Sequence, residues 1–398
     1  MIVSRFLLWA RDAPPGDRVE AVTALAQAFL HSDLTPDNRW EARMALTAML
    51  DDPSALVRRA MAVVLASSPE APRPIVVALA DDQDDIAEIV LARSPVLSDA
   101  DLVDRAALGA ERLQCAIATR PWLSTSVSAA LAEIGTPDAL LRLARNEGAE
   151  ITGASLARMI ERHGGSGLLR EALLVRPDLP VEITQAIVAA LAESLGGFVT
   201  GCGWLSAERS GRITRDARER TTVALSVSAE CEDAERLVRH LRRSAQLTPA
   251  LILRAILSRA TPFAAAAFAE LSGLASARVA AILQDARGYA FRALYGRSGL
   301  PENLRPAFEA ALCARREVGD PDGPARLSGW MVERALAACE ALPPEDAGRL
   351  VALLRRFEVE AARDEARREA YGLADQAALA LVMEHAPEML VPHGRWAA

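Results

Sequence analysis

The chain has 398 residues, of which 51% are hydrophobic, 25% charged and 4% aromatic, a balance typical of a globular protein with enough apolar material for a core. All 45 cationic residues are arginine, which excludes mechanisms that need a lysine amine, such as Schiff-base chemistry, pyridoxal-phosphate anchoring and Walker-A phosphate binding. The formal net charge of −8 is uneven, with −9 in residues 1–195 and +1 in residues 196–398, which disfavours nucleic acid or anionic lipid as a partner of the first part.

The cysteines and the N-terminal residues indicate where the protein resides. The five cysteines are scattered without a CxxC pair, as is typical of small buried side chains in a reducing cytosol. The apolar run within the first ten residues is shorter than a signal peptide requires, and we find no 18-residue apolar stretch after it. We therefore predict a cytoplasmic protein with no membrane partner.

Nearly every segment has the apolar spacing of an α-helix, at intervals of three and four residues, so we predict an all-α fold. Thr248 and Thr261 each precede a proline, and Ser98 stands three residues before Asp101, which predicts helix N-caps at these positions. Helix ends are predicted at Gly109, Gly135 and Gly164.

The first half of the chain contains an internal repeat. Its anchors are spaced by 26, 26, 26 and 30 residues, and they are Pro69, Pro95, Pro121, Glu147 and Pro177. Four residues before the anchors stands an apolar column of Leu65, Leu91, Ile117, Leu143 and Leu173. Because the residue before a proline avoids helical dihedrals, each unit is predicted to be a helix that ends at the anchor, a turn and a second helix. Stacked units of this kind form an α-solenoid.

Several of these segments resemble known helical repeats. The opening Asp51-Asp52-Pro53 with Val57-Arg58-Arg59 is similar to HEAT-like repeats, and Leu91-Ala92-Arg93-Ser94-Pro95-Val96-Leu97 is similar to leucine-rich-variant repeats. Residues from about 40 to 315 resemble an uncharacterised alphaproteobacterial domain-of-unknown-function family. The resemblance implies the fold and carries no catalytic residues to this chain. Glu147 departs from the proline pattern.

We predict four regions along the chain. They are a helical-repeat solenoid over 1–195, a glycine-rich linker over 196–204, a second helical domain over 205–323, and C-terminal helices with a tail over 324–398. The linker prediction rests on four glycines among nine residues, which disfavour a helix.

Three short motifs suggest chemistry but have simpler structural explanations. Cys202 stands between two glycines, yet the segment lacks the strand and the third glycine of a dinucleotide loop. The run from His163 to Gly167 lacks the strand and the final glycine of a nucleophile elbow. The acidic run 81–85 lacks the glycine and glutamate of an EF-hand loop. We predict no catalytic residue, no metal ligand and no cofactor.

One cluster of arginines is a candidate binding site. Every third residue is arginine at Arg209, Arg212, Arg215 and Arg218, and residues three apart on a helix are neighbours. Such guanidinium groups suit phosphate, carboxylate or an acidic peptide. Interleaved acidic residues leave internal pairing or a solvated face as the simpler explanation.

These observations favour a non-catalytic protein-binding scaffold or regulatory adaptor that uses the surface of the helical repeats. Two alternatives remain. The first is nucleic-acid binding through the arginines of residues 209–218, which predicts affinity that falls steeply with salt. The second is an unrecognised enzyme with a site in an interdomain cleft near Cys202, which predicts a thiol that alkylates rapidly near neutral pH.

Overall fold

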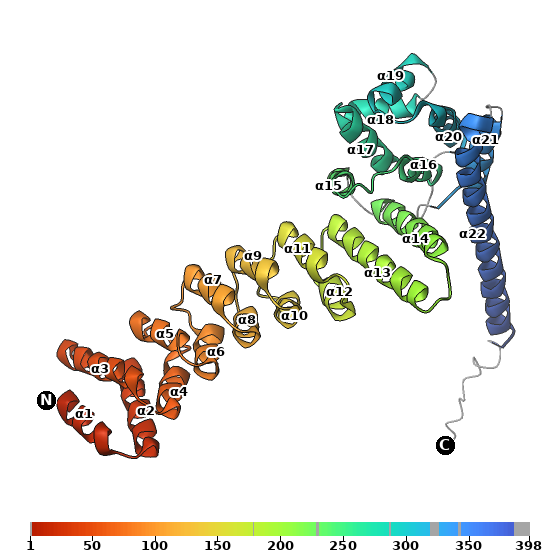
Figure 1. Ribbon diagram of the computed structural model, residues 1–398. Coiled ribbons are helices and arrows are strands. Elements are labelled where there is room, and N and C mark those ends of the chain that lie inside the picture. Colours follow the sequence, from red (N-terminus) through yellow and green to blue (C-terminus); the bar gives the residue numbers. More distant parts are fainter. Residues whose placement is uncertain are drawn as a thin grey trace, which may run out of the picture. The chain divides into compact units, whose positions relative to one another are not determined.

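The computed structural model describes residues 2–177, 179–227, 231–285, 288–318, 326–340 and 344–385. Within these ranges the chain folds into 22 α-helices and two short 3₁₀ helices, and the only β pairing is a single parallel bridge between Leu123 and Ala149 (Figure 1). The all-α prediction is confirmed. The contacts divide the chain into two compact units, Met1–Phe198 and Val199–Ala398, here named unit 1 and unit 2.

Unit 1 is built from short helices joined by tight turns. They are α1 (Ile2–Asp12), α2 (Pro15–His31), α3 (Pro36–Ala48), η1 (Met49–Asp51), α4 (Ala55–Leu65), α5 (Arg73–Ala80), α6 (Asp84–Arg93), α7 (Asp99–Leu108), α8 (Glu111–Ala118), α9 (Thr125–Ile134), α10 (Pro137–Arg145), α11 (Gly153–His163), α12 (Gly167–Leu174) and α13 (Val181–Gly201).

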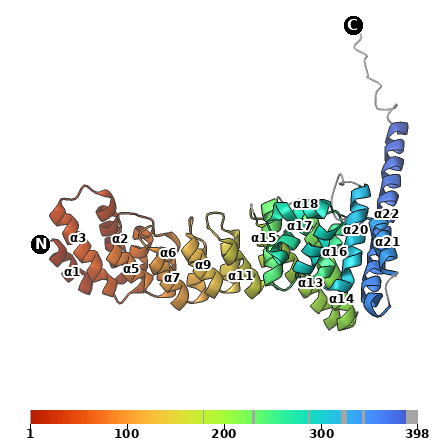
Figure 2. The same ribbon diagram turned by 90° about the horizontal axis from the view of Figure 1, so that it is seen from above.

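The helices of unit 1 form two rows. The even row contains α4, α6, α8, α10 and α12, each packed on the next member of the row. The odd row contains α7, α9 and α11, which pack in the same way and lie side by side in Figure 2. One continuous core of buried Leu, Ile, Val and Ala side chains fills the space between the rows. Each helix therefore buries its apolar face against neighbours that come from adjacent units in the sequence.

The predicted anchors lie where the repeat requires them. Each of the five follows a helix of the even row and lies in the turn after it. All five members of the apolar column are fully buried, which predicts a cost of about 2–5 kcal/mol for truncating one of them to alanine. Glu147 lies in its turn as the prolines do, because the backbone of Asn146 before it is extended, with φ −79° and ψ 107°. The proline is thus dispensable where the preceding residue already leaves the helical conformation.

Side chains one residue before the anchors join successive turns, a feature that the sequence analysis missed. Arg120 donates to the carbonyls of Leu91 and Ser94, at 2.6 and 2.7 Å. Asn146 donates to the carbonyls of Ala118 and Arg120, at 2.9 and 2.7 Å. These bonds satisfy helix-terminal carbonyls that the turns would otherwise leave without a donor.

Most of the predicted caps are present, with one exception. Ser98 and Asp101 form a complete capping box, and the Thr248 hydroxyl accepts from the backbone N–H of Leu251. Gly109 and Gly135 end their helices, and Gly164 is the C-cap of α11. Thr261 is the first residue of its helix rather than its cap, because its hydroxyl accepts a hydrogen bond from Arg315 at 2.6 Å instead.

Unit 2 combines helices of 9 to 14 residues with the longer α14 and α22, of 21 and 42 residues. Its helices are α14 (Ala207–Val227), α15 (Cys231–Arg243), α16 (Pro249–Leu257), α17 (Thr261–Ser272), α18 (Ser276–Gln284), α19 (Tyr289–Arg297), η2 (Glu302–Leu304), α20 (Arg305–Val318), α21 (Gly329–Glu340) and α22 (Pro344–His385). The C-terminal helices predicted from residue 324 include the 42-residue α22. The predicted boundary at residue 324 and the end of the tail, 386–398, lie outside the described residues.

An aromatic cluster and the buried part of α16 lie at the core of unit 2. Phe268, Phe291, Tyr295 and Phe308 pack edge to face or tilted, with ring centroids 5.4–6.5 Å apart. Every residue of α16 from Leu251 to Leu257 is buried. An arginine within α16 must therefore find its counter-charge inside the unit.

The glycine-rich segment is helical for longer than predicted. α13 continues through Gly196 and Gly197 to Gly201. The prediction of a loop over 196–204 is therefore wrong for residues 196–201, which are helical. A glycine costs about 1 kcal/mol in a helix, and the long apolar segment that precedes these glycines outweighs that cost. The break falls after Gly201, where Gly203 adopts φ +72°, a conformation that favours glycine.

α13 also departs from the expectation that no long apolar stretch exists. Its most apolar 18-residue window has a mean hydropathy of 1.4 and is 22% buried, so by length and composition α13 could cross a membrane. The pair α17 and α18 meets the same criteria only when joined across a bend of 119°. A core helix of a soluble protein satisfies the test equally well, so these helices are weak evidence for a membrane span.

Candidate functional site

The predicted arginine stripe lies on α14. The Ser206 hydroxyl accepts from the backbone N–H of Arg209 at the start of the helix, and Gly211 does not interrupt it. Because an α-helix turns about 100° per residue, each step of three residues moves the side chain by about 60° around the axis. The four arginines therefore spread over about half of the circumference, and Arg209 and Arg218 lie on nearly opposite sides.

The contacts of these arginines agree with that spread. Arg209, Arg212 and Arg215 are exposed, and Arg218 is half-buried. Arg212 pairs with Glu208 at 3.2 Å within one helix turn, a surface pair worth little stability. The structure does not bring the four predicted residues together into one site.

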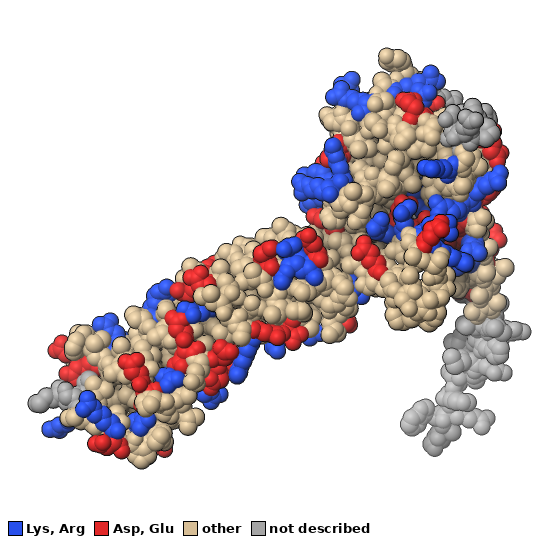
Figure 3. Space-filling view, viewed as in Figure 1, with Lys and Arg blue, Asp and Glu red and all other residues tan. Residues whose placement is uncertain are grey.

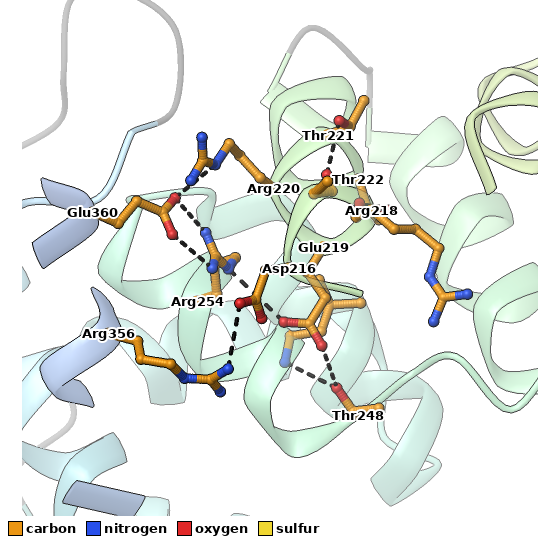
Figure 4. A network of polar contacts seen from close by, with 12 residues as sticks. Asp216, Arg218, Glu219, Arg220, Thr221, Thr222, Thr248, Arg254, Arg356 and Glu360 are labelled. Atoms are coloured by element: carbon orange, nitrogen blue, oxygen red, sulfur yellow. Dashed lines mark hydrogen bonds and ion pairs between the residues drawn. The ribbon is translucent and has the colours of Figure 1, made fainter. Parts of the chain in front are cut away.

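A different arginine is the centre of the polar network of unit 2. Arg254 projects from α16 and is 1% exposed. Its two terminal nitrogens donate to the carboxylate of Glu360 on α22, at 2.7 and 3.0 Å, and its guanidinium lies over the ring of Phe357 at 4.4 Å (Figure 4). Arg220 of α14 reaches the same carboxylate at 2.8 Å. Glu360 therefore joins three helices of unit 2.

A second glutamate faces Arg254 from α14. Glu219 is 6% exposed, and its carboxylate lies 3.9 Å from the Nε of Arg254, a nitrogen that is buried without a hydrogen-bond acceptor. The Thr248 hydroxyl donates to Glu219 at 3.4 Å, which is a long bond. Arg218 points away from this network in Figure 4.

The two glutamates differ in their ionisation. Burial raises the pKa of Glu219, and the charge of Arg254 offsets only part of this effect. Burial also opposes ionisation of Glu360, but the hydrogen bonds and charges of Arg254 and Arg220 outweigh it and lower the pKa of Glu360. Arg254 is thus held by one well-paired carboxylate and one poorly paired carboxylate.

A cavity of about 720 Å³ opens above the Arg254–Glu360 pair. It is lined by α14, α16, α22 and the segment just before α21, and its charged lining residues are Arg220, Arg254, Arg326, Arg367, Arg368, Glu360, Asp364 and Asp375. A second cavity of about 500 Å³ shares part of this lining and adds Asp216 and Arg356, which pair at 3.3 Å. In Figure 3 basic and acidic side chains gather on this face of unit 2, over α14 and α22.

The sequence analysis missed this cluster, although two signals pointed to it. Arg254 interrupts the otherwise apolar run Leu251–Leu257, which is unusual unless the charge is paired. On α22, charged residues recur at Glu360, Asp364, Arg367 and Arg368, at the spacing of one helix face.

Unit 1 has grooves of its own, both on the even row. The larger, of about 770 Å³, is lined by residues of α6, α8 and α10, and the smaller, of about 460 Å³, by residues of α10 and α12 with the turn that follows. In the larger groove half-buried Ile89, Ala92 and Ala116 lie among the charged residues Glu88, Arg93, Glu111, Arg112, Asp138 and Arg142. Glu88 and Arg112 pair across α6 and α8, at 2.7 Å between one oxygen and one terminal nitrogen.

The remaining candidates of the sequence have structural environments. Cys202 is exposed in the turn after α13. His163 is in the last turn of α11, where burial lowers its pKa, and Ser166 caps α12. In the acidic run, Asp82 pairs with Arg58 at 2.6 and 3.0 Å, and Asp84 begins α6. No group of three potential metal ligands occurs in the part of the chain that the structure describes.

Comparisons with known proteins give a family for this chain. Neither the curated proteins nor the solved structures include a match to it. A family model described as an uncharacterised protein conserved in bacteria matches residues 86–352, about two thirds of the chain. This stretch covers most of the repeats of unit 1 and the helices of unit 2 as far as the start of α22. The chain therefore belongs to the uncharacterised bacterial family DUF2336.

Proposed function

We propose that this protein is a non-catalytic binding scaffold or regulatory adaptor whose unit 1 captures a protein partner. In this proposal unit 1 is an α-solenoid of HEAT-like or leucine-rich-variant repeats, in a cytoplasmic alphaproteobacterial protein that makes no membrane contact. The rows of helices and the turns at the anchors support it, because repeats that contact only their neighbours build extended binding surfaces.

The observation that carries the proposal is the pair of grooves on the even row. Residues of α10 line both grooves, so the two lie along one surface of unit 1. That surface combines half-buried apolar side chains with exposed charges, which is the composition of an interface that forms and dissociates.

Charge indicates the kind of partner. Residues 1–195 carry a net charge of −9, and a field of that sign speeds association with a basic surface. We infer that the partner presents arginine or lysine around an apolar anchor.

The alternatives have less support. Nucleic-acid binding through Arg209–Arg218 needs arginines on one face, whereas these spread over about half of α14. An enzyme that uses Cys202 needs a base or a cation that activates the thiol, and the structure shows this cysteine free and exposed in a turn.

Affinity purification of the full-length tagged protein from its native cells, with nuclease treatment, tests the proposal. We expect one protein partner in near-stoichiometric amount. Glu111→Arg with Asp138→Arg reverses two exposed charges of the larger groove and should abolish its recovery. Asp104→Arg with Glu150→Arg makes the same change of charge at exposed positions outside the groove and should leave recovery unchanged.

Equal recovery with both double variants would contradict the location of the site. Recovery of nucleic acid, or of proteins that nuclease releases, would contradict the adaptor function and support the first alternative. The two double variants have identical net charge, so a non-specific electrostatic effect would change both samples alike.

A further inference from the structure

The cavity of unit 2 holds more positive charge than the ion pairs of the unit use. Five arginines and three acidic residues line it. Arg326, Arg367 and Arg368 are exposed to the cavity and form no ion pair with described residues, and the Nε of Arg368 donates only to a backbone carbonyl of its own helix. These three guanidinium groups are available to an anion.

The floor of the cavity is rigid. Arg254 is held by Glu360 on one side and by the ring of Phe357 on the other, and all three side chains belong to packed helices. Glu360 also pairs with Arg220, whose Nε lies 2.8 Å from its carboxylate, so a second guanidinium is held at the floor. A guanidinium that is already oriented loses less side-chain entropy on binding, so the floor favours affinity.

The chemistry of the lining selects phosphate over a simple monovalent anion. Guanidinium groups bind phosphate through two parallel N–H···O bonds, and several of them around one cavity suit a ligand with more than one negative charge. A volume of about 720 Å³ is within the usual range of sites for small organic ligands. The lining therefore suits a phosphorylated organic molecule better than an inorganic ion.

An aromatic ring lies next to the arginines. Tyr371 follows Arg367 by four residues and Arg368 by three, so the three side chains share one face of α22. The ring is 72% exposed and lines the cavity. Asp375 is one helix turn further along and also lines it, and a carboxylate accepts hydrogen bonds from the amino or imino groups of a purine.

We propose that this cavity binds a nucleoside phosphate, with Arg326, Arg367 and Arg368 holding the phosphates and Tyr371 stacking on the base. From Arg367 to Tyr371 the axis of α22 advances by about 6 Å, which is within the length of one nucleotide. The site is formed by unit 2 alone, so it does not depend on the protein-binding function proposed for unit 1.

Isothermal titration of the full-length protein with ATP, GTP and inorganic tripolyphosphate tests the site. We expect one nucleotide per chain, with tripolyphosphate binding more weakly at the same place. Arg367→Ala with Arg368→Ala should weaken both kinds of ligand by about tenfold or more, because charge-assisted hydrogen bonds are lost. Tyr371→Ala should weaken the nucleotide several-fold and leave tripolyphosphate unchanged.

Arg349→Ala is the matched control, since Arg349 is exposed on the same helix and lines neither cavity. All four side chains are exposed, so thermal unfolding of each variant should match that of the wild type. The proposal is overturned if neither nucleotide binds with a Kd below about 1 mM. It is also overturned if the arginine pair and the control behave alike, or if a single-stranded oligonucleotide displaces the nucleotide and binds more tightly.

Discussion

Arginine has different structural roles in the two units. In unit 1 three arginines are bound to backbone: Arg120, Arg162 and Arg176 each donate to two or more carbonyls of an earlier turn, whereas the buried Arg18 pairs with the carboxylate of Asp52. In unit 2 arginines from three helices and the segment before α21 gather around one cavity, and within the described residues only Arg254 and Arg220 pair with a carboxylate there. Because the chain has no lysine, arginine serves both as a structural residue and as a candidate binding residue. The two roles are distinguished by what each guanidinium contacts, since the residue type is the same.

The largest loss of stability is expected when the buried Arg254 of unit 2 loses its carboxylate partner. Glu360→Gln leaves the guanidinium of Arg254 buried without its paired carboxylate, and removing one member of a buried ion pair costs about 3 kcal/mol or more. Urea unfolding followed by circular dichroism measures the free energy of unfolding, and Glu369→Gln, exposed on the same helix, is the control.

The pH dependence of this effect has a definite sign. Since the pKa of Glu360 is lowered in the folded protein, its contribution is complete above the pKa of an unfolded glutamate, about 4.3, and is lost as the pH falls through the folded value. The wild type and Glu360→Gln should therefore converge in acid. A constant difference in stability from pH 7 to pH 3 would contradict the assignment.

A smaller effect is expected from the arginines that join the turns of unit 1. Arg120→Ala removes two hydrogen bonds to carbonyls that are buried in the repeat, and we expect a loss of about 2 kcal/mol. Arg93→Ala, at an exposed position one unit earlier, should change stability by less than about 0.5 kcal/mol. Equal urea midpoints for the two variants would show that Arg120 is not structural.

The glutamate that faces Arg254 from the other side should behave in the opposite way to Glu360. Burial raises the pKa of Glu219, so the stability of the wild type falls as the pH rises from the unfolded pKa to the folded one. Glu219→Gln removes this dependence and should be neutral or stabilising at pH 7, by about 1 kcal/mol or less, because glutamine still accepts from Thr248. A clear loss of thermal stability at pH 7 would mean that the carboxylate supports Arg254 as Glu360 does.

The smallest effect is expected at the irregular anchor. Glu147→Pro restores the proline of the other anchors, and within the described residues the Glu147 N–H donates to no carbonyl that the proline would lose. Because Asn146 is already extended, the folded chain accepts the proline without strain. The substitution should stabilise unit 1 by about 0.5 kcal/mol, because proline lowers the conformational entropy of the unfolded chain. Destabilisation of more than about 1 kcal/mol would show that the turn at Glu147 differs from those at the prolines.

The local features of the fold could be predicted from the sequence. Pro95 and Pro121 fix turns because the constraint acts on the adjacent residue, and Ser98 with Asp101 forms its capping box within one helix turn. Gly196 and Gly197 led to the wrong prediction of a loop. Their cost inside a helix is about 1 kcal/mol each, and the long apolar segment of α13 outweighs it.

The cavity could not be predicted in the same way. Arg254 and Glu360 are 106 residues apart, and only the packing of α16 on its neighbours brings them together. The spacing of the arginines in residues 209–218 also suggested a single stripe that the helix does not form. Side chains three residues apart move steadily around the helix axis, whereas a repeat of 3.6 residues keeps them on one face. The arginines that share the cavity come from four segments, and the spacing within one segment does not show which of the others it meets.

The most direct test of the account is a comparison of the two rows of unit 1 in living cells. A photo-crosslinking amino acid would replace Arg93, Thr119 or Arg142, which line the larger groove of the even row, or Asp104, Leu108 or Ile134, which are exposed on the odd row. The account predicts one protein adduct of constant mass from the groove positions and none from the odd row. Equal adducts from both rows, or none from the groove, would contradict the claim that unit 1 binds a partner through its even row.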